Sequence, residues 1–203
     1  MKRLLCLLLC VCMLGFMVGC ESVESGNSVI VSGALDATLE YLNGTTGDWQ
    51  TYEGDQATIG GGIWEPGYVS MQILRVGNEG TLDFKWQINL AAESLTELAD
   101  AIDVYVKLGV SSFPSSADEI ESWQNCGALS QVLGSGIAEG LLQAKSGEQA
   151  SYETLAVALR MRLDASEDYR NTQQLGSVRV NLLVTQHSES EEDAFENAYD
   201  PAA

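Results

Sequence analysis

Histidine is almost absent from this 203-residue chain, which has one, His187, and no H-E-x-x-H motif. A catalytic zinc is usually held by three protein ligands, most often including two histidines, so a zinc hydrolase lacks its ligands here. His187 is also the only base available to a Ser-His-Asp triad, and its neighbours Ser188 and Ser190 lie in a polar tail. We therefore expect no catalytic residues, no cofactor and no metal, and predict that the protein is not an enzyme.

Basic residues are scarce as well. The chain has 10 Lys and Arg against 29 Asp and Glu, a net charge of −19 that becomes −21 once the two cations Lys2 and Arg3 are removed with a leader. Nucleic-acid binding depends on neutralising phosphates with cationic side chains, so we expect no nucleic-acid partner. A chain of this charge stays soluble and repels anionic surfaces or gathers cations.

A membrane-spanning helix needs roughly 20 apolar residues. The uncharged run 4–18 has only 15 and follows Lys2 and Arg3, which is typical of a signal peptide over residues 1–20. A membrane anchor helix is the alternative. The run ends in M-V-G-C, which resembles a bacterial lipoprotein box, so Cys20 is the predicted lipidation site and the predicted link to the membrane.

Cysteine is too rare for a disulfide framework. Cys6, Cys10 and Cys12 would leave with the signal peptide and Cys20 would carry lipid, so Cys126 would remain alone. The simplest interpretation of Cys126 is a half-buried small residue in the core.

The segment 63–90 is the most clearly patterned part of the chain. Apolar and polar residues alternate over 82–90, which predicts a strand with one buried face. A Pro66-Gly67 turn precedes a first strand over 68–76, which is apolar on both faces near its end. The three-residue loop 78–80 ends in glycine, and we expect it to close a β-hairpin.

The remaining patterns extend this to an all-β protein. We expect strands over 35–41, 48–53, 103–110, 155–163 and 178–184, short helices over 93–102 and 116–123, and helix plus loop over 127–147. No parallel βαβ rhythm is present, and the helices fall in one mid-chain insertion. The fold class predicted is an antiparallel β-sandwich over residues 33–187.

The order W-E-P-G-Y, a strand, N-E-G-T-L and a second strand resembles the TasA/camelysin family of secreted bacterial biofilm-matrix proteins. Segments 33–40, 184–186 and 192–200 are similar to the first strand and the closing segment of that family. The resemblance implies a jelly-roll sandwich. Mature proteins of that family usually begin with an alanine followed by an aromatic pair, which this chain lacks. This difference favours a lipid anchor over cleavage by SipW, the signal peptidase with which the family is often exported. The motif residues are Trp64, Pro66, Gly67, Asn78, Gly80, Trp86, Phe195 and Tyr199.

Two segments flank the predicted domain. Residues 21–32 form a polar tether that ends in Val29, Ile30 and Val31, and the resemblance implies that this apolar stretch is donated as a strand to another subunit. The alternative is that it pairs within its own sheet. The acidic tail 188–203 is either solvated or a calcium ligand, although it lacks the spacing of a calcium loop. Its Phe195 and Tyr199 could dock the terminus on the sandwich.

Three functions are compatible with these features. The first is an exported structural protein of the cell surface or extracellular matrix, whose partners are its own copies or paralogous matrix subunits and which builds or anchors biofilm fibres. The second is a lipid-anchored binding module for glycan or protein. The third, a camelysin-like metalloendopeptidase, is disfavoured by the ligand count.

Overall fold

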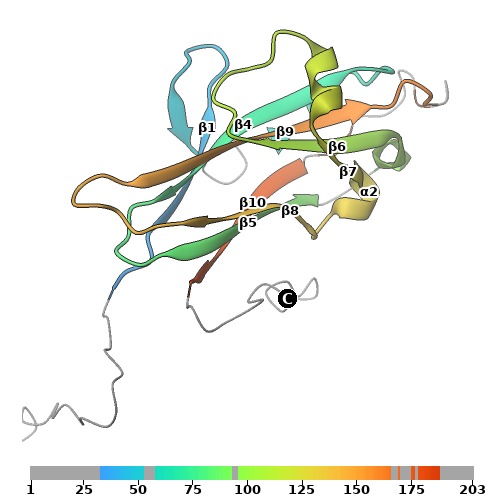
Figure 1. Ribbon diagram of the computed structural model, residues 1–203. Coiled ribbons are helices and arrows are strands. Elements are labelled where there is room, and N and C mark those ends of the chain that lie inside the picture. Colours follow the sequence, from blue (N-terminus) through green and yellow to red (C-terminus); the bar gives the residue numbers. More distant parts are fainter. Residues whose placement is uncertain are drawn as a thin grey trace, which may run out of the picture. The chain divides into compact units, whose positions relative to one another are not determined.

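The computed structural model describes residues 33–52, 58–92, 96–165, 169, 175–176 and 178–187. Within these ranges the chain forms two antiparallel sheets that lie one above the other (Figure 1). The predicted all-β sandwich is therefore confirmed. The jelly-roll variant that the resemblance implies stays a prediction, as do the leader 1–20, the tether 21–32 and the tail 188–203, which lie outside the described residues.

The larger sheet has six strands, in the order β2 (Trp49–Thr51), β1 (Ala37–Leu42), β4 (Val69–Asn78), β9 (Ser151–Met161), β6 (Ile102–Leu108) and β7 (Gln124–Ala128). The smaller sheet has four, in the order β3 (Thr58–Ile59), β10 (Val178–Gln186), β5 (Phe84–Ala92) and β8 (Gly136–Leu142). All neighbours are antiparallel, and β4 and β9 form the longest ladder.

The helical turns that the structure describes from end to end are short and lie between β5 and β8, as the sequence predicts. They are two 3₁₀ turns, η2 (Glu97–Ala101) and η3 (Ala117–Ser122), and one α-helical turn, α2 (Leu129–Val132). The helix expected over 93–102 is a 3₁₀ turn at Glu97–Ala101, and residues 93–95 lie outside the described ranges; the helix expected over 116–123 is a 3₁₀ turn at Ala117–Ser122. The expectation of helix plus loop over 127–147 is right only for α2 and the loop after Leu142, because all of β8 and the end of β7 also lie in this region. None of the helices in the described part of the chain is long and apolar enough to cross a bilayer.

Alternation along β5 creates the inner face of the smaller sheet. Every second side chain of this strand is fully buried, and each contributes about 1.5–3 kcal/mol on burial. The opposing face of the larger sheet is equally apolar, so the two sheets enclose one main core. Its largest contributors are Trp64, Leu74, Val76, Phe84, Trp86, Ile88, Leu90, Val104, Leu155, Val157, Leu159 and Met161.

A second, smaller core covers the outer face of the larger sheet. Ile73 of β4 and Ala156 and Ala158 of β9 point outward, yet none of them is exposed to solvent. Ile120 and Trp123, at and just after η3, lie against them. This cover explains why the sequence of β4 is apolar on both faces.

The predicted hairpin over 63–90 is wrong. Although β4 and β5 follow one another, β4 pairs with β1 and β9 while β5 pairs with β10 and β8. The connection Glu79–Asp83 therefore crosses from one sheet to the other, and we refer to residues 79–83 as the crossover. A hairpin would have placed both apolar strands in one sheet, whereas the crossover sets β4 and β5 on opposite sides of the main core.

Candidate functional site: the cross-sheet junction and the open strand edges

Asn78, the last residue of β4, joins the two sheets through its side chain. Its Nδ2 donates to the carbonyl oxygens of Leu82 at 2.9 Å, Leu142 at 3.3 Å and Gln143 at 3.0 Å. Its Oδ1 accepts a hydrogen bond of 2.9 Å from the amide of Gly80. The side chain is fully buried, so these bonds satisfy polar groups that water does not reach. One amide side chain thus ties β4, the crossover and the end of β8 together.

Gly80 fits the crossover because another segment passes very close to it. A Cβ atom at this position would lie 2.3 Å from the carbonyl oxygen of Ala34, which only glycine avoids. The amides of Glu79 and Thr81 donate to the carbonyl oxygens of Asp36 at 2.8 Å and Ala34 at 2.9 Å. The first described residues are therefore fixed on the crossover.

The W-E-P-G-Y motif forms the entry to β4. The amide of Tyr68 donates to the carbonyl oxygen of Glu65 at 2.8 Å, and Gly67 has a φ of 86°, so the type II turn expected at Pro66-Gly67 is confirmed. Trp64 is buried, donates from Nε1 to the carbonyl oxygen of Gly60 at 3.2 Å, and meets the ring of Tyr68 edge to face. The motif is a packed corner of the core.

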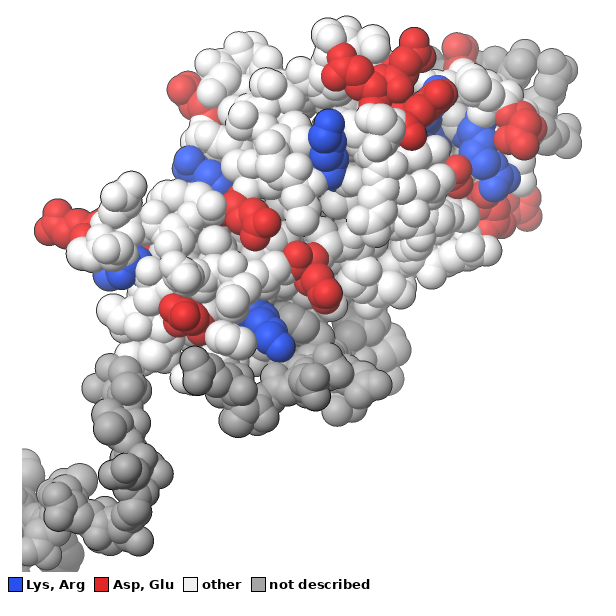
Figure 2. All heavy atoms as spheres, viewed as in Figure 1, with Lys and Arg blue, Asp and Glu red and all other residues white. Residues whose placement is uncertain are grey.

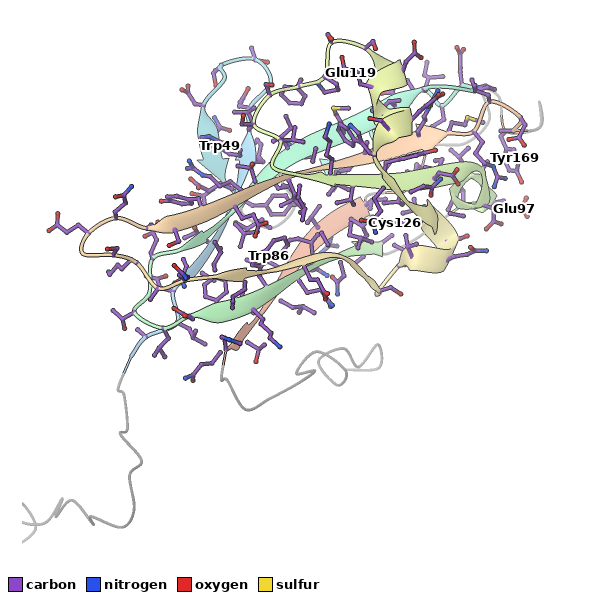
Figure 3. The ribbon with its side chains drawn as sticks, in the orientation of Figure 1. Trp49, Trp86, Glu97, Glu119, Cys126 and Tyr169 are labelled. Atoms are coloured by element: carbon purple, nitrogen blue, oxygen red, sulfur yellow. The ribbon has the colours of Figure 1, made fainter. Side chains whose placement is uncertain are left out.

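Trp86 lies between the two sheets (Figure 3). Its ring is fully buried, and its Nε1 donates to Oε2 of Glu153 on β9, in the opposite sheet, at 3.1 Å. A Cβ at Gly140 would lie 2.7 Å from the Trp86 ring, so β8 needs glycine where the ring crosses it. The bond to Glu153 gives the buried indole a partner and sets the spacing of the sheets at this point.

The edge of the smaller sheet formed by β8 has no strand partner on its outer side within the described ranges. β8 pairs with β5 alone, over Gly136–Leu142. A slot of about 380 Å³ lies beside it, lined by Val106, Leu108, Gln124, Gly136, Ile137, Ala138 and Glu139. Leu108 in this slot is 47% exposed, and Leu141 on β8 is 48% exposed. Within the described ranges, the β8 edge thus has no strand partner on its outer side and lies beside the exposed side chain of Leu108.

The opposite side of the sandwich is covered over only part of its length. β2 pairs with β1 only at Glu40–Leu42, and β3 pairs with β10 only at Val178 and Arg179. Both uncovered stretches lie at the crossover end of the domain, because Ala37 pairs with Asn78 and Gln186 with Phe84. We call this the half-open side; its apolar residues are Leu35, Ala37, Leu39, Leu182 and Val184.

Sequence analysis missed Arg75, which organises the outer face of the larger sheet near its β2 edge. Its guanidinium lies 4.6 Å from the centre of the Trp49 ring and 4.4 Å from that of Tyr152, and its Nη2 is 2.6 Å from Oε2 of Glu40. The four side chains come from four different strands. No local sequence pattern predicts this group of side chains, because they come together only through the order of the strands in the sheet.

The described residues contain no group of three His, Cys, Asp or Glu side chains placed to hold a metal. His187, directly after β10, is half-buried, and its Nδ1 has no hydrogen-bond partner within the described ranges. Cys126 is half-buried as expected, and burial raises the pKa of its thiol, which keeps the thiol protonated. The predicted absence of catalysis stays a prediction, since parts of the chain lie outside these ranges.

The six motif residues within the described part of the chain gather at two places. Trp64, Pro66 and Gly67 form the corner before β4, whereas Asn78, Gly80 and Trp86 surround the crossover. Their roles are in packing and backbone geometry. The other predicted site residues lie outside the described residues: Cys20, Val29, Ile30, Val31, Phe195 and Tyr199.

Charge on the surface does not single out a ligand. On the face drawn in Figure 2, acidic and basic side chains both occur, and acidic ones gather around η3, which carries Asp118 and Glu119 in its first turn. The carboxylate of Glu119 accepts hydrogen bonds from the hydroxyl and amide of Ser115, which lower its pKa. These bonds give Glu119 a structural role in holding the turn.

Comparison with known proteins adds no relative. Neither a scan against models of protein families nor a search of curated proteins finds a match to this chain. The resemblance to the TasA/camelysin family rests on the sequence motifs, and the candidate site rests on the geometry of the crossover and the open edges.

Proposed function

We propose that the protein is an exported structural protein of the cell surface or extracellular matrix, anchored by lipid at Cys20 and joined to other copies or to paralogous subunits by strand pairing. The observation that supports this proposal is the β8 edge. It is seven residues long, has a single charged side chain, Glu139, and borders the slot that Leu108 lines. Edge strands of this kind are usually blocked by lysine, proline or a covering loop, and β8 has none of the first two.

The β8 edge suits an extended apolar segment. Backbone groups along the edge would pair with the incoming chain, and Val106, Leu108 and Ala138 would contact every second side chain of it. These residues are part of the lining of the slot, and Leu108 is 47% exposed. Pairing would cover both the backbone of β8 and the side chain of Leu108.

The proposed donor is the stretch Val29-Ile30-Val31. All three residues are β-branched and favour an extended conformation. Gly33 lies beside the crossover, and an extended segment of the length of residues 21–32 spans at most about 40 Å, which is enough to contact a second molecule. The resemblance to biofilm-matrix proteins adds support for assembly. Pairing of the same stretch along its own β1 is the alternative.

Light scattering of three purified chains tests this proposal. We expect the chain 21–203 to assemble, the chain 33–203 to remain monomeric, and Leu108→Ser within 21–203 to weaken assembly by removing an apolar contact from the slot. Leu163→Ser is a matched control, because Leu163 is 68% exposed and does not line the slot. Equal assembly of 21–203 and 33–203 would refute strand donation.

A binding module is a second candidate, and one observation favours it. A pocket of about 410 Å³ lies between the end of β6 and η3, with three serine hydroxyls, Lys107, Glu119 and the rings of Phe113 and Trp123 in its lining. Hydroxyls, charges and an exposed aromatic edge suit a glycan. Calorimetric titration with oligosaccharides, comparing Phe113→Ala with the unchanged protein, distinguishes this function from assembly.

A further inference from the structure

We infer that the acidic C-terminal segment 188–203 folds back over the half-open side of the sandwich and closes it with Phe195 and Tyr199. This goes beyond the proposed assembly function, because it concerns a contact within one chain. It would leave the β8 edge as the side open to a partner.

Burial along β10 decreases at the point where β3 ends. Val178 is fully buried and Val180 is 4% exposed, whereas Leu182 is half-buried and Val184 is 38% exposed. These four side chains alternate along one strand and therefore point to the same inner face. The rise in exposure toward the end of β10 therefore arises because nothing in the described part of the chain covers these side chains, and not because they point to the other face.

The facing strand shows the same decrease in the same direction. Tyr41, Leu39 and Ala37 of β1 share the inner face and are half-buried, and Leu35, beyond the end of the strand, is 43% exposed. Since Ala37 and Gln186 both lie at the crossover end, the two decreases describe one apolar strip between the edges of the two sheets. A single segment laid along the strip would cover both.

The backbone of β10 is prepared for such a segment. The amide of Val180 donates to the hydroxyl of Tyr52 at 3.0 Å, away from β5, whereas the amide of His187 donates to Asp83 at 3.0 Å, toward the β5 side. Because successive amides in a strand alternate in direction, those of Leu182, Val184 and Gln186 also point away from β5. Within the described ranges no strand pairs with β10 there.

We assign the strip to the acidic tail 188–203 because of where the tail begins and which residues it contains. It starts directly after His187, at the end of the strip, and its first eight residues can span about 26 Å, longer than the six-residue stretch 181–186. Phe195 and Tyr199 are four residues apart, so they lie on one face in a strand and in a helix alike.

Hydrogen exchange measured residue by residue tests the inference. In the chain 21–203, the amides of Leu182, Val184 and Gln186 should exchange at least tenfold more slowly than in the chain 21–187. Phe195→Ser with Tyr199→Ser should accelerate the same amides in the full-length tail, while Glu196→Gln, which keeps both rings, should not. Amides in the centre of β9 serve as the internal reference, because β9 is paired on both sides, with β4 and with β6.

Two results would overturn the inference. The first is equal exchange of these three amides with and without the tail. The second is protection that depends on protein concentration but not on the tail, which would assign the strip to a second copy. Should 21–187 fail to fold, the double serine variant alone decides between these outcomes. Assembly through the β8 edge is tested separately, by light scattering of the Leu108→Ser variant, so either proposal can fail without the other.

Discussion

Arg160 on β9 and Glu121 on η3 form an ion pair, with Nη1 of the arginine 2.9 Å from Oε1 of the glutamate. The arginine side chain is 9% exposed and that of the glutamate 58%. The pair holds η3 against the outer face of the larger sheet, where Ile120 and Trp123 form the second core.

The ion pair predicts an asymmetry between two substitutions. Glu121→Gln leaves a buried guanidinium without its carboxylate and should lower the free energy of unfolding by about 0.5–1 kcal/mol, a small value because the glutamate is solvated. Arg160→Met removes the buried charge itself and should change stability by less than about 1 kcal/mol. Urea unfolding at low and high salt measures both; a larger loss for Arg160→Met would contradict this account.

Trp86 should be among the most sensitive positions of the core. Trp86→Ala removes a fully buried indole and should cost about 3–5 kcal/mol. Trp86→Phe retains most of the apolar contact but loses the bond to Glu153, so it should cost less. Gly140→Ala should cost about 1–3 kcal/mol, because the new methyl group overlaps the ring. Equilibrium unfolding in urea measures the loss of unfolding free energy in each variant. A smaller loss for Trp86→Ala than for Trp86→Phe would contradict this prediction.

Asn78→Ala should destabilise the protein although it removes few apolar atoms. The carbonyl oxygens of Leu82 and Gln143 and the amide of Gly80 lose a buried partner, at about 1–3 kcal/mol for each group that finds no other. Asn78→Asp should be no better, since a carboxylate cannot donate to the carbonyl oxygens. The exposed Gln143→Ala is the control. Thermal unfolding that is unchanged in Asn78→Ala would mean that water replaces the side chain.

Stability should fall at alkaline pH through two buried acids. Burial raises the pKa of Tyr52 above its ordinary 10.0 and that of Cys126 above its ordinary 9.0. Above those pH values the unfolded chain loses protons that the folded protein keeps, so the stabilisation is complete below them and is lost as pH rises. Tyr52→Phe and Cys126→Ala should each flatten the alkaline slope of the unfolding free energy. Unchanged slopes in both variants would refute the assignment.

The proposed lipid anchor predicts a change in mature mass. If Cys20 is diacylated, the mature protein begins there and partitions into detergent, and Cys20→Ala should block both processing and partitioning. Globomycin, which inhibits lipoprotein signal peptidase, should have the same effect on processing as the substitution. An identical mature mass with and without these treatments would exclude the anchor.

The strands with strong alternation could be predicted from the sequence, but their partners could not. Period-2 patterns identified β1, β5, β6, β9 and β10, because the larger apolar side chains occupy every second position in each of these strands. The same patterns placed β4 and β5 in a hairpin, since nothing local distinguishes a hairpin loop from a crossover. The crossover is fixed by Asn78, whose bonds reach Leu142 and Gln143, more than 60 positions away.

The strands β7 and β8 were missed for a related reason. Glycine lowers strand propensity, and residues 127–147 contain several. In the folded protein Gly140 is required by the ring of Trp86 and Gly136 by the side chain of Gln87, which passes 2.4 Å from a Cβ placed there. The glycines that weaken the sequence signal are thus the residues that let β8 approach β5.

The crossover between β4 and β5 has a consequence for the order in which the protein can fold. β4 must wait for β9, beginning at Ser151, and β5 must wait for β10, which ends at Gln186. Neither sheet can therefore be completed by the first two thirds of the chain. Topologies with such distant pairings fold slowly, on the order of milliseconds to seconds for all-β domains. A ribosome or a secretion channel would thus handle the chain as an unfolded polymer until almost its whole length has emerged.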